Sequence, residues 1–257
     1  MAKTVHGWDG RFESPTVVAI IQARMGSERL PGKVLERIRG IPALELQVRR
    51  LLSSVEVTTF CIATSVEVAD DAIEGLAHEL GILCVRGSES DVLSRFADAL
   101  RLSDADVVVR LTADCPFHDH RVVDQAIAAF RGHRADYVSN AIRRTFPIGL
   151  DCEVMSAEVL LAAASRATSQ SDREHVTPYI YRELTDVRSV DFGLPVDLSG
   201  LRWTLDTAAD LQALRAIAER LPGDEWHECS WTEILGVVLE DPSLAEINRH
   251  VEHRHVT

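Results

Sequence analysis

Short apolar runs alternate along the chain with longer stretches in which apolar residues recur every three or four positions. The short runs are typical of buried strands, and the longer stretches are typical of amphipathic helices. This alternation predicts an α/β fold with a mostly parallel, mixed central sheet and helices on both faces. The predicted strands span residues 17–22, 58–64, 82–86, 106–111, 135–139, 151–155, 187–192 and 201–204. The predicted helices span residues 42–53, 68–80, 90–101, 119–131, 156–166, 171–183, 207–220, 230–240 and 243–249.

The start and the middle of the chain depart from this pattern. Residues 1–15 carry no periodicity and include two glycines and a proline, so we expect a poorly ordered lead-in there. Residues 16–257 are expected to form a single domain, because a chain of 257 residues with 46% hydrophobic side chains can bury one large core. Region 140–195 does not keep the strict alternation of strand and helix.

The loop after the first predicted strand gathers cations and glycines. That strand is almost wholly apolar and β-branched, so its loop lies at the carboxyl edge of a parallel sheet, where α/β folds place their ligands. Gly26 and Gly32 let backbone amides approach phosphate oxygens. Arg24 and Arg29 can bind those oxygens through forked guanidinium groups, and Lys33 adds a point charge. The loop therefore predicts a site for a nucleoside triphosphate.

The alternative interpretation of this loop is an ordinary solvated surface. The chain as a whole is acidic, with 27 Lys+Arg against 40 Asp+Glu and a formal net charge of −13, so a local cationic cluster favours phosphate binding. The loop is not a Walker A motif, because Lys33 is not followed by Ser or Thr, and the dinucleotide fingerprint G-x-G-x-x-G is also missing.

Two aspartates each follow a predicted strand. Asp114 follows the β-branched strand 106–111, and Asp206 follows the short strand 201–204. Each aspartate could simply cap the helix that comes next. Two carboxylates beside a triphosphate would repel it, however, unless a hard divalent cation lies between them, and Mg²⁺ prefers carboxylates together with phosphate oxygens. The pair therefore predicts a magnesium site.

The cationic loop also carries a family resemblance. Residues 23–33, Ala-Arg-Met-Gly-Ser-Glu-Arg-Leu-Pro-Gly-Lys, resemble the A-R-x-x-S-x-R-x-x-x-K signature of the cytidylyltransferases that make CMP-activated sugar acids, and resemble most the branch described as spore coat polysaccharide biosynthesis protein F-like. The resemblance implies a Rossmann-like nucleotidyltransferase that couples a nucleoside triphosphate to a small acceptor and releases pyrophosphate. It continues through residues 85–93, 112–116, 149–154, 173–179 and 202–206.

The resemblance also assigns roles to the nucleotide side of the site. Arg24, Lys33 and Asp114 are the implied catalytic residues, and Asp114 and Asp206 are the implied ligands of Mg²⁺. The triphosphate is implied to be CTP. The implied nucleotide-binding residues are Ala23, Arg24, Gly26, Ser27, Arg29, Lys33, Thr64, Arg86 and Ser88, of which the last three would surround the base.

On the acceptor side, the resemblance makes region 140–195 the part that holds a sugar or sugar acid and helps to form a homodimer. Within it, His175 is either a base or a structural residue. Ile148 stands where members of the branch often have an acidic residue, which puts the usual acceptor in question. The implied acceptor-binding residues are Arg143, Arg144, Glu153, Arg173 and His175, with Glu174 beside them.

Composition limits the other possibilities. We expect a cytoplasmic protein without a membrane partner, because no apolar run approaches the length of a membrane span and the N-terminus lacks the apolar core of a signal peptide. The acidity, without a basic stripe beyond the loop, argues against a nucleic-acid partner. Asp119 is expected to cap a helix rather than to bind a metal with its histidine neighbours, and Trp226 and Trp231 are expected to anchor the C-terminal helices.

Three functions remain open from the residues and the resemblance. The first is magnesium-dependent transfer of CMP to a sugar, sugar acid or related small acceptor. The second is guanylyl or uridylyl transfer to a sugar 1-phosphate, and the third is nucleotide binding without turnover. The presence of both Asp114 and Asp206 favours an enzyme, since a simple binding protein has no evident need for two carboxylates beside a triphosphate.

Overall fold

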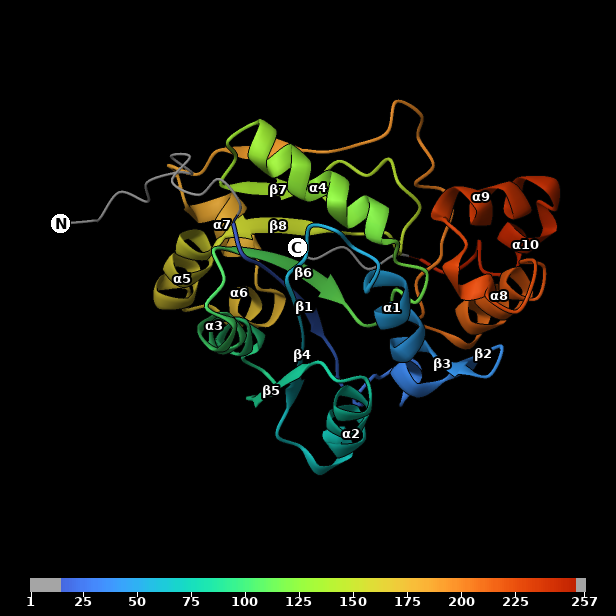
Figure 1. Cartoon of the computed structure of the whole chain (residues 1–257), viewed down its shortest axis with the longest axis horizontal. Coiled ribbons are helices and arrows are strands. Elements are labelled where there is room, and N and C mark those ends of the chain that lie inside the picture. Colours follow the sequence, from blue (N-terminus) through green and yellow to red (C-terminus); the bar gives the residue numbers. More distant parts are fainter. Residues whose placement is uncertain (1–14, 253–257) are drawn as a thin grey trace.

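A seven-stranded sheet forms the centre of the computed structural model, which describes residues 15–252 (Figure 1). From one edge to the other its strands are β5 (Leu83–Gly87), β4 (Thr59–Ser65), β1 (Val17–Gln22), β6 (Val107–Thr112), β8 (Glu153–Ser156), β7 (Tyr137–Ser139) and β9 (Ser189–Asp191). Neighbouring strands are parallel, except that β8 is antiparallel to both β6 and β7. The mostly parallel, mixed sheet that the sequence predicts is confirmed. Residues 1–14 of the expected lead-in lie outside the described residues.

Helices cover both faces of this sheet. Ile21 of β1 packs into one apolar cluster and Ile20 into the other, because successive side chains of a strand point to opposite faces. The first face carries α1 (Ala43–Leu51), α2 (Asp71–Glu79) and α4 (His120–Gly132). The second carries α3 (Val92–Ser103), α5 (Ala157–Arg166) and α7 (Pro178–Glu183), with α6 (Gln170–His175) against α3. Within residues 15–252, no helix combines the length and the apolar character needed to cross a bilayer.

A third apolar cluster joins the C-terminal helices to one end of the sheet, at the right of Figure 1. Its elements are α8 (Ala208–Ala218), η3 (Trp226–Glu228), α9 (Trp231–Glu240), α10 (Ser243–Glu246) and the hairpin of β2 (Arg37–Ile38) and β3 (Ile41–Pro42). Trp226 is buried in this cluster, and the ring of Trp231 lies 5.5 Å from that of Phe146. Both tryptophans anchor this end of the molecule, as predicted. Asp119 caps α4, which is also as predicted.

The prediction of a strand at residues 201–204 is wrong in its extent, because this segment makes only an isolated bridge between Arg202 and Ile148. Trp203 donates its N–H to the Ile148 carbonyl at 2.7 Å. Gly149, with a φ of 109°, permits this approach, since a Cβ there would lie 2.7 Å from the backbone carbon of Trp203. The segment therefore crosses beside the sheet rather than extending it.

One further prediction differs from the structure, and one element was not predicted. The single helix predicted at 171–183 is two helices, α6 and α7, because Val176 has a φ of 71° and Pro178 has no N–H to continue a helical ladder. The β2–β3 hairpin was not predicted, since two-residue strands are too short to show a period of two. Region 140–195 supplies β8 and β9 to the central sheet and α5, α6 and α7 to one of its faces. Its separate role in acceptor binding and dimerisation stays a prediction.

Candidate functional site

The cationic loop starts at the carboxyl edge of the sheet and folds back on itself. Ala23 continues the pairing of β1 with β4 by donating its N–H to the Ala63 carbonyl at 3.1 Å. Gly32 donates its N–H to the Met25 carbonyl at 3.0 Å, with a φ of 72° that glycine adopts without strain. The Met25 N–H in turn donates to Asp70 Oδ1 at 2.7 Å, at the end of η2 (Val68–Asp70). The loop thus closes over the edge of the sheet and ends in η1 (Lys33–Leu35).

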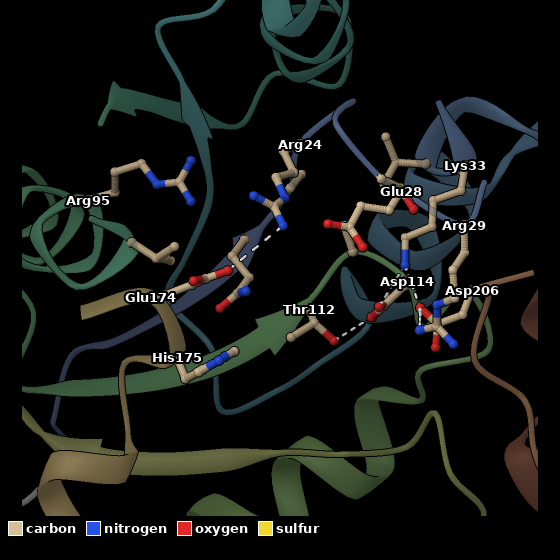
Figure 2. A pocket seen from close by; sticks show the side chains of 16 residues that line it. Arg24, Glu28, Arg29, Lys33, Arg95, Thr112, Asp114, Glu174, His175 and Asp206 are labelled. Carbon is tan, nitrogen blue, oxygen red and sulfur yellow. Dashed lines mark hydrogen bonds and ion pairs between the residues drawn. The ribbon is translucent and has the colours of Figure 1, made fainter. Parts of the chain in front are cut away.

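A cavity of about 400 Å³ lies beside this loop (Figure 2). Residues from both halves of the chain line it, from β1, the cationic loop, η1 and β6 and from α3, α6 and the segment before α8. Of the residues predicted for the site, the cavity is lined by Ala23, Arg24, Ser27, Arg29, Lys33, Asp114, His175 and Asp206. It is also lined by Gln22, Glu28, Val34, Val92, Arg95, Thr112, Ala113 and Glu174.

The two predicted metal ligands converge on one lysine at one end of the cavity. Lys33 Nζ lies 2.9 Å from Asp114 Oδ2 and 2.7 Å from Asp206 Oδ1. Asp206 is held further by Arg29 at 3.1 Å and by Arg202 at 2.8 Å. The Leu205 N–H donates to the Asp114 carbonyl at 2.7 Å, so the crossing segment fixes the two aspartates beside each other. Each of the two carboxylates thus directs an oxygen at a single cation.

The charges at this end reinforce one another. Burial alone would lower the pKa of Lys33, but the neighbouring Asp114 and Asp206 carboxylates outweigh it and raise that pKa above 10.5. Burial would raise the pKa of Asp114, yet the Lys33 ammonium and the hydrogen bond from Thr112, at 2.6 Å, hold it well below its ordinary value. Lys33 and Asp114 are therefore both charged at neutral pH.

Arg24, Glu174 and His175 line the cavity away from Asp114 and Asp206 (Figure 2). The Arg24 guanidinium lies 3.5 Å from Glu89 Oε1 and 3.9 Å from Glu174 Oε1, and its side chain is 45% exposed. Such loose, exposed pairs contribute little stability, so Arg24 can exchange them for an anionic ligand at little cost. Burial lowers the pKa of His175, which keeps its imidazole neutral at neutral pH.

Comparison with known proteins assigns the chain to a protein family. A family model described as cytidylyltransferase matches residues 18–219. The chain belongs to the cytidylyltransferase family. It is therefore a nucleotidyltransferase, and the matched region contains all eight predicted residues that line the cavity.

Several proteins are similar to this chain over most of its length. Spore coat polysaccharide biosynthesis protein SpsF of Bacillus subtilis is 32% identical over 89% of this cytidylyltransferase and 96% of its own length. An uncharacterized protein of Methanocaldococcus jannaschii is 32% identical over 93% and 96% of the two chains. A cytidylyltransferase structure from Leptospira borgpetersenii superimposes with a TM-score of 0.86, at 29% identity, over 94% of this chain and 100% of that chain. CMP:2-keto-3-deoxy-manno-octonic acid synthetase, solved in complex with CTP, shares the fold, with a TM-score of 0.58 at 19% identity over 80% and 99% of the two chains.

Four predicted nucleotide-binding residues do not line the cavity of this cytidylyltransferase. Thr64 is fully buried and donates its hydroxyl to Asp70 Oδ2 at 3.0 Å. The Arg86 guanidinium binds the Asp71 and Glu74 carboxylates, each at 2.7 Å. Ser88 accepts the Asp91 N–H at 3.2 Å, in the turn before α3. The fourth residue is Gly26, whose missing Cβ would lie 3.2 Å from Glu89 Oε1.

Of the predicted acceptor-binding residues, only His175 lines the cavity. Glu153 is buried in β8, where it pairs with Arg110 and accepts the Tyr137 hydroxyl. Arg144 pairs with Asp151 at 2.5 Å. Arg143 is exposed to solvent, and the half-buried Arg173 lies on α6. The roles of these residues toward an acceptor stay predictions.

A substitution of Arg173 can distinguish the predicted acceptor-binding role from a structural role, because the side chain makes several contacts within the protein. Its guanidinium pairs with Asp91, the N-cap of α3, at 2.7 Å and donates to the carbonyls of Ala164 and Ala167. Arg173→Met should therefore lower the free energy of unfolding by about 2 kcal/mol, measured by urea denaturation. The matched control is Arg182→Met, which removes a more exposed arginine, 41% against 26%, from its pair with Asp172 and should cost less than about 1 kcal/mol. Unchanged stability with a raised KM for the acceptor would instead support the acceptor role.

Two cavity residues carry a signal in the sequence that the predictions do not use. Arg95 sits on the apolar stripe of α3, between Val92 and Phe96, where a charged side chain is seldom buried without a function. Gln22 ends the otherwise apolar strand β1. A polar residue on a buried face needs a hydrogen-bonding group, either from a ligand or from another residue of the protein. The periodicity of the sequence does not distinguish these two sources.

Proposed function

We propose that this protein transfers CMP from CTP to a sugar, sugar acid or related small acceptor and releases pyrophosphate, in a reaction that depends on Mg²⁺. The observation that carries the proposal is the convergence of Asp114 and Asp206 on Lys33, at 2.9 Å and 2.7 Å, beside the cationic loop of a cytidylyltransferase. In this reaction an acceptor oxygen attacks the α-phosphorus of CTP, the bond between that phosphorus and the bridging oxygen breaks, and pyrophosphate leaves.

The chain's own cations suit the leaving group. Arg24 and Arg29 carry forked guanidinium groups that can each bind two phosphate oxygens, and Lys33 adds a compact charge. All three side chains line one cavity, so the β- and γ-phosphates can be held while charge develops on them. Positioning and electrostatics then supply most of the catalysis, as in other phosphoryl-type transfers, and we expect no covalent enzyme intermediate.

The two aspartates fit a hard divalent cation. Their oxygens are anionic, they approach one point from two segments, and that point already accommodates a positive charge, the Lys33 ammonium. Two carboxylates with room for phosphate oxygens form the donor set that Mg²⁺ prefers. Asp114 and Asp206 would therefore hold Mg²⁺, which neutralises charge on the phosphoryl oxygens when bound. Lys33 would then turn from the carboxylates to the phosphates.

The class of acceptor rests on the relatives. SpsF is named for polysaccharide biosynthesis, and an enzyme of Shewanella, 30% identical over 47% of this chain and 50% of its own length, is named 8-amino-3,8-dideoxy-manno-octulosonate cytidylyltransferase. A sugar or sugar acid is the acceptor class common to these names. A homodimer, which the family resemblance implies, is proposed with it and is testable by analytical ultracentrifugation.

The proposal is tested with purified protein, Mg²⁺ and each of CTP, UTP, GTP and ATP, against a panel of sugars, sugar acids and sugar phosphates. We expect pyrophosphate release that requires both CTP and an acceptor, together with a CMP conjugate seen by mass spectrometry. Calorimetry on the same samples should show that CTP binds more tightly with Mg²⁺ than without it. Absence of triphosphate binding, or a preference for another nucleotide, would contradict the proposal.

A further inference from the structure

Arg95 lines the cavity, and two nitrogens of its guanidinium group have no hydrogen-bond partner among residues 15–252. The residue is only 2% exposed, and it lines the cavity from α3. Its Nε and Nη1 atoms are buried and have no hydrogen-bond partner, and no ion pair joins Arg95 to any residue within 15–252. Burial lowers the pKa of Arg95, although Asp70 opposes the effect. A buried donor without an acceptor lowers the stability of the folded protein, and a bound ligand that supplies the acceptor removes this cost.

Gln22 presents the matching acceptor. Its Oε1 atom is buried and has no hydrogen-bond partner among residues 15–252, and the residue lines the same cavity. Side chains alternate along β1, so Gln22 points to the same face of the sheet as Val18 and Ile20, which pack with the apolar side chains of α3. The Arg95 donors on α3 and the Gln22 acceptor on β1 therefore line one cavity from two elements in contact.

Arg95 lies at the end of the cavity opposite the Asp114 and Asp206 carboxylates (Figure 2). Figure 2 shows Lys33, Arg29, Asp114 and Asp206 together at one end, Arg95 at the other, and Arg24 between them. A nucleotide whose triphosphate binds the cationic end would extend its base toward Arg95. Val92, which lines the cavity one helical turn before Arg95, offers an apolar contact for a planar ring.

The placement of Arg95 depends on a glycine. A Cβ on Gly87, at the end of β5, would lie 2.9 Å from Arg95 Cγ, so a larger residue there would displace the arginine stem. Gly87 lets α3 bring the guanidinium close to the sheet edge. Arg95 thus lies on the part of α3 that packs over β5, β4 and β1.

We propose that Arg95 and Gln22 read the base, and so set the preference for cytosine; the inference rests on the function proposed above. Cytosine presents two adjacent acceptors, O2 and N3, and one donor, the N4 amino group. The fork of a guanidinium group can donate to both acceptors at once, and Gln22 Oε1 can accept from N4. Uracil carries N–H at N3 and a carbonyl at C4, so it would place a donor against Arg95 and an acceptor against Gln22 Oε1. Phosphate suits the pair less well, because Gln22 Oε1 would repel its oxygens.

The test compares the affinity of Arg95→Lys, Arg95→Met and Gln22→Met for CTP, UTP and inorganic pyrophosphate, by calorimetry with Mg²⁺. Arg95→Lys keeps the charge but loses the fork, and it should weaken CTP binding roughly 10- to 150-fold while UTP binding changes much less. Gln22→Met keeps the shape but loses the acceptor, and it should weaken CTP binding about tenfold. Pyrophosphate affinity should stay within about twofold, because the phosphate-binding loop is intact.

Arg101→Met is the matched control, because Arg101 lies on the same helix, is 63% exposed and, among the described residues, pairs only with Asp98. It should leave all three affinities unchanged. Equal weakening of CTP, UTP and pyrophosphate in Arg95→Lys would overturn the inference by making Arg95 a phosphate ligand, and unchanged CTP affinity would overturn it as well. A wild-type protein that fails to prefer CTP contradicts the proposed function instead, so the two failures are distinguishable. Arg95→Lys and Gln22→Met keep the test decisive if Arg95→Met does not fold.

Discussion

Asp114→Asn is expected to reduce acceptor-dependent pyrophosphate release from CTP by about a hundred- to a thousandfold. Asparagine keeps the shape of the side chain, and its one carbonyl oxygen can accept a hydrogen bond from either Thr112 or Lys33, which bind different Asp114 oxygens at 2.6 Å and 2.9 Å in the wild-type protein. It lacks the negative charge that a hard divalent cation needs. The loss of rate is therefore expected from the magnesium site, and urea denaturation of the variant measures separately the effect of losing the Lys33 ion pair. The rate is measured with a coupled pyrophosphate assay at saturating CTP.

The same variant separates metal binding from nucleotide binding. In calorimetry, Mg²⁺ should tighten CTP binding to the wild-type protein but no longer do so in Asp114→Asn. The matched control is Asp98→Asn, which removes a carboxylate that is 53% exposed and remote from the cavity, and which should keep the wild-type rate. A wild-type rate in Asp114→Asn would rule out the Asp114 carboxylate as a ligand of the catalytic metal.

Much of this site could be predicted because local patterns determine it. The strand β1 is predicted with its observed bounds, since a continuous β-branched run between polar segments has few other structures open to it. Arg24, Arg29 and Lys33 follow the end of that strand by two, seven and eleven residues in one glycine-containing loop, and the loop returns to the strand end through the hydrogen bond from Gly32 to Met25. Parallel strands share an edge, and this brings Asp114 of the β6 end to the same place.

The remainder depends on contacts between distant segments, which periodicity does not encode. Asp206 reaches Asp114 because the crossing segment before it is held at the Ile148 and Asp114 carbonyls, not because it is a strand of the sheet. Arg86 lies near the end of strand β5, as a base-binding residue could, but carboxylates of α2 hold its guanidinium. Arg95 interrupts the apolar stripe of its helix, but periodicity cannot show that it lines the cavity, since that depends on how α3 packs against the sheet.

The second large effect is expected on stability, from Lys33→Met in buffer without divalent cations. The Lys33 side chain is 12% exposed, and its ammonium lies between the Asp114 and Asp206 carboxylates. Removing it leaves Asp114 with the Thr112 hydroxyl but without an ion pair, whereas Asp206 keeps Arg29 and Arg202. The free energy of unfolding should fall by about 2–3 kcal/mol, measured by urea denaturation. Equal stability of variant and wild type would contradict the structural role of the ammonium.

The dependence on pH and on Mg²⁺ identifies the groups involved. The pKa of Lys33 is raised, so its contribution is complete below 10.5 and is lost as the pH rises further. The pKa of Asp114 is lowered, so its contribution is complete well above 3.8 and is lost as the pH falls below that value. The stability difference between wild type and Lys33→Met should therefore be constant from about pH 5 to 9 and shrink in acid. Because Mg²⁺ would take the place of the ammonium between the carboxylates, it should stabilise Lys33→Met more than the wild type, in which the cation must first displace Lys33.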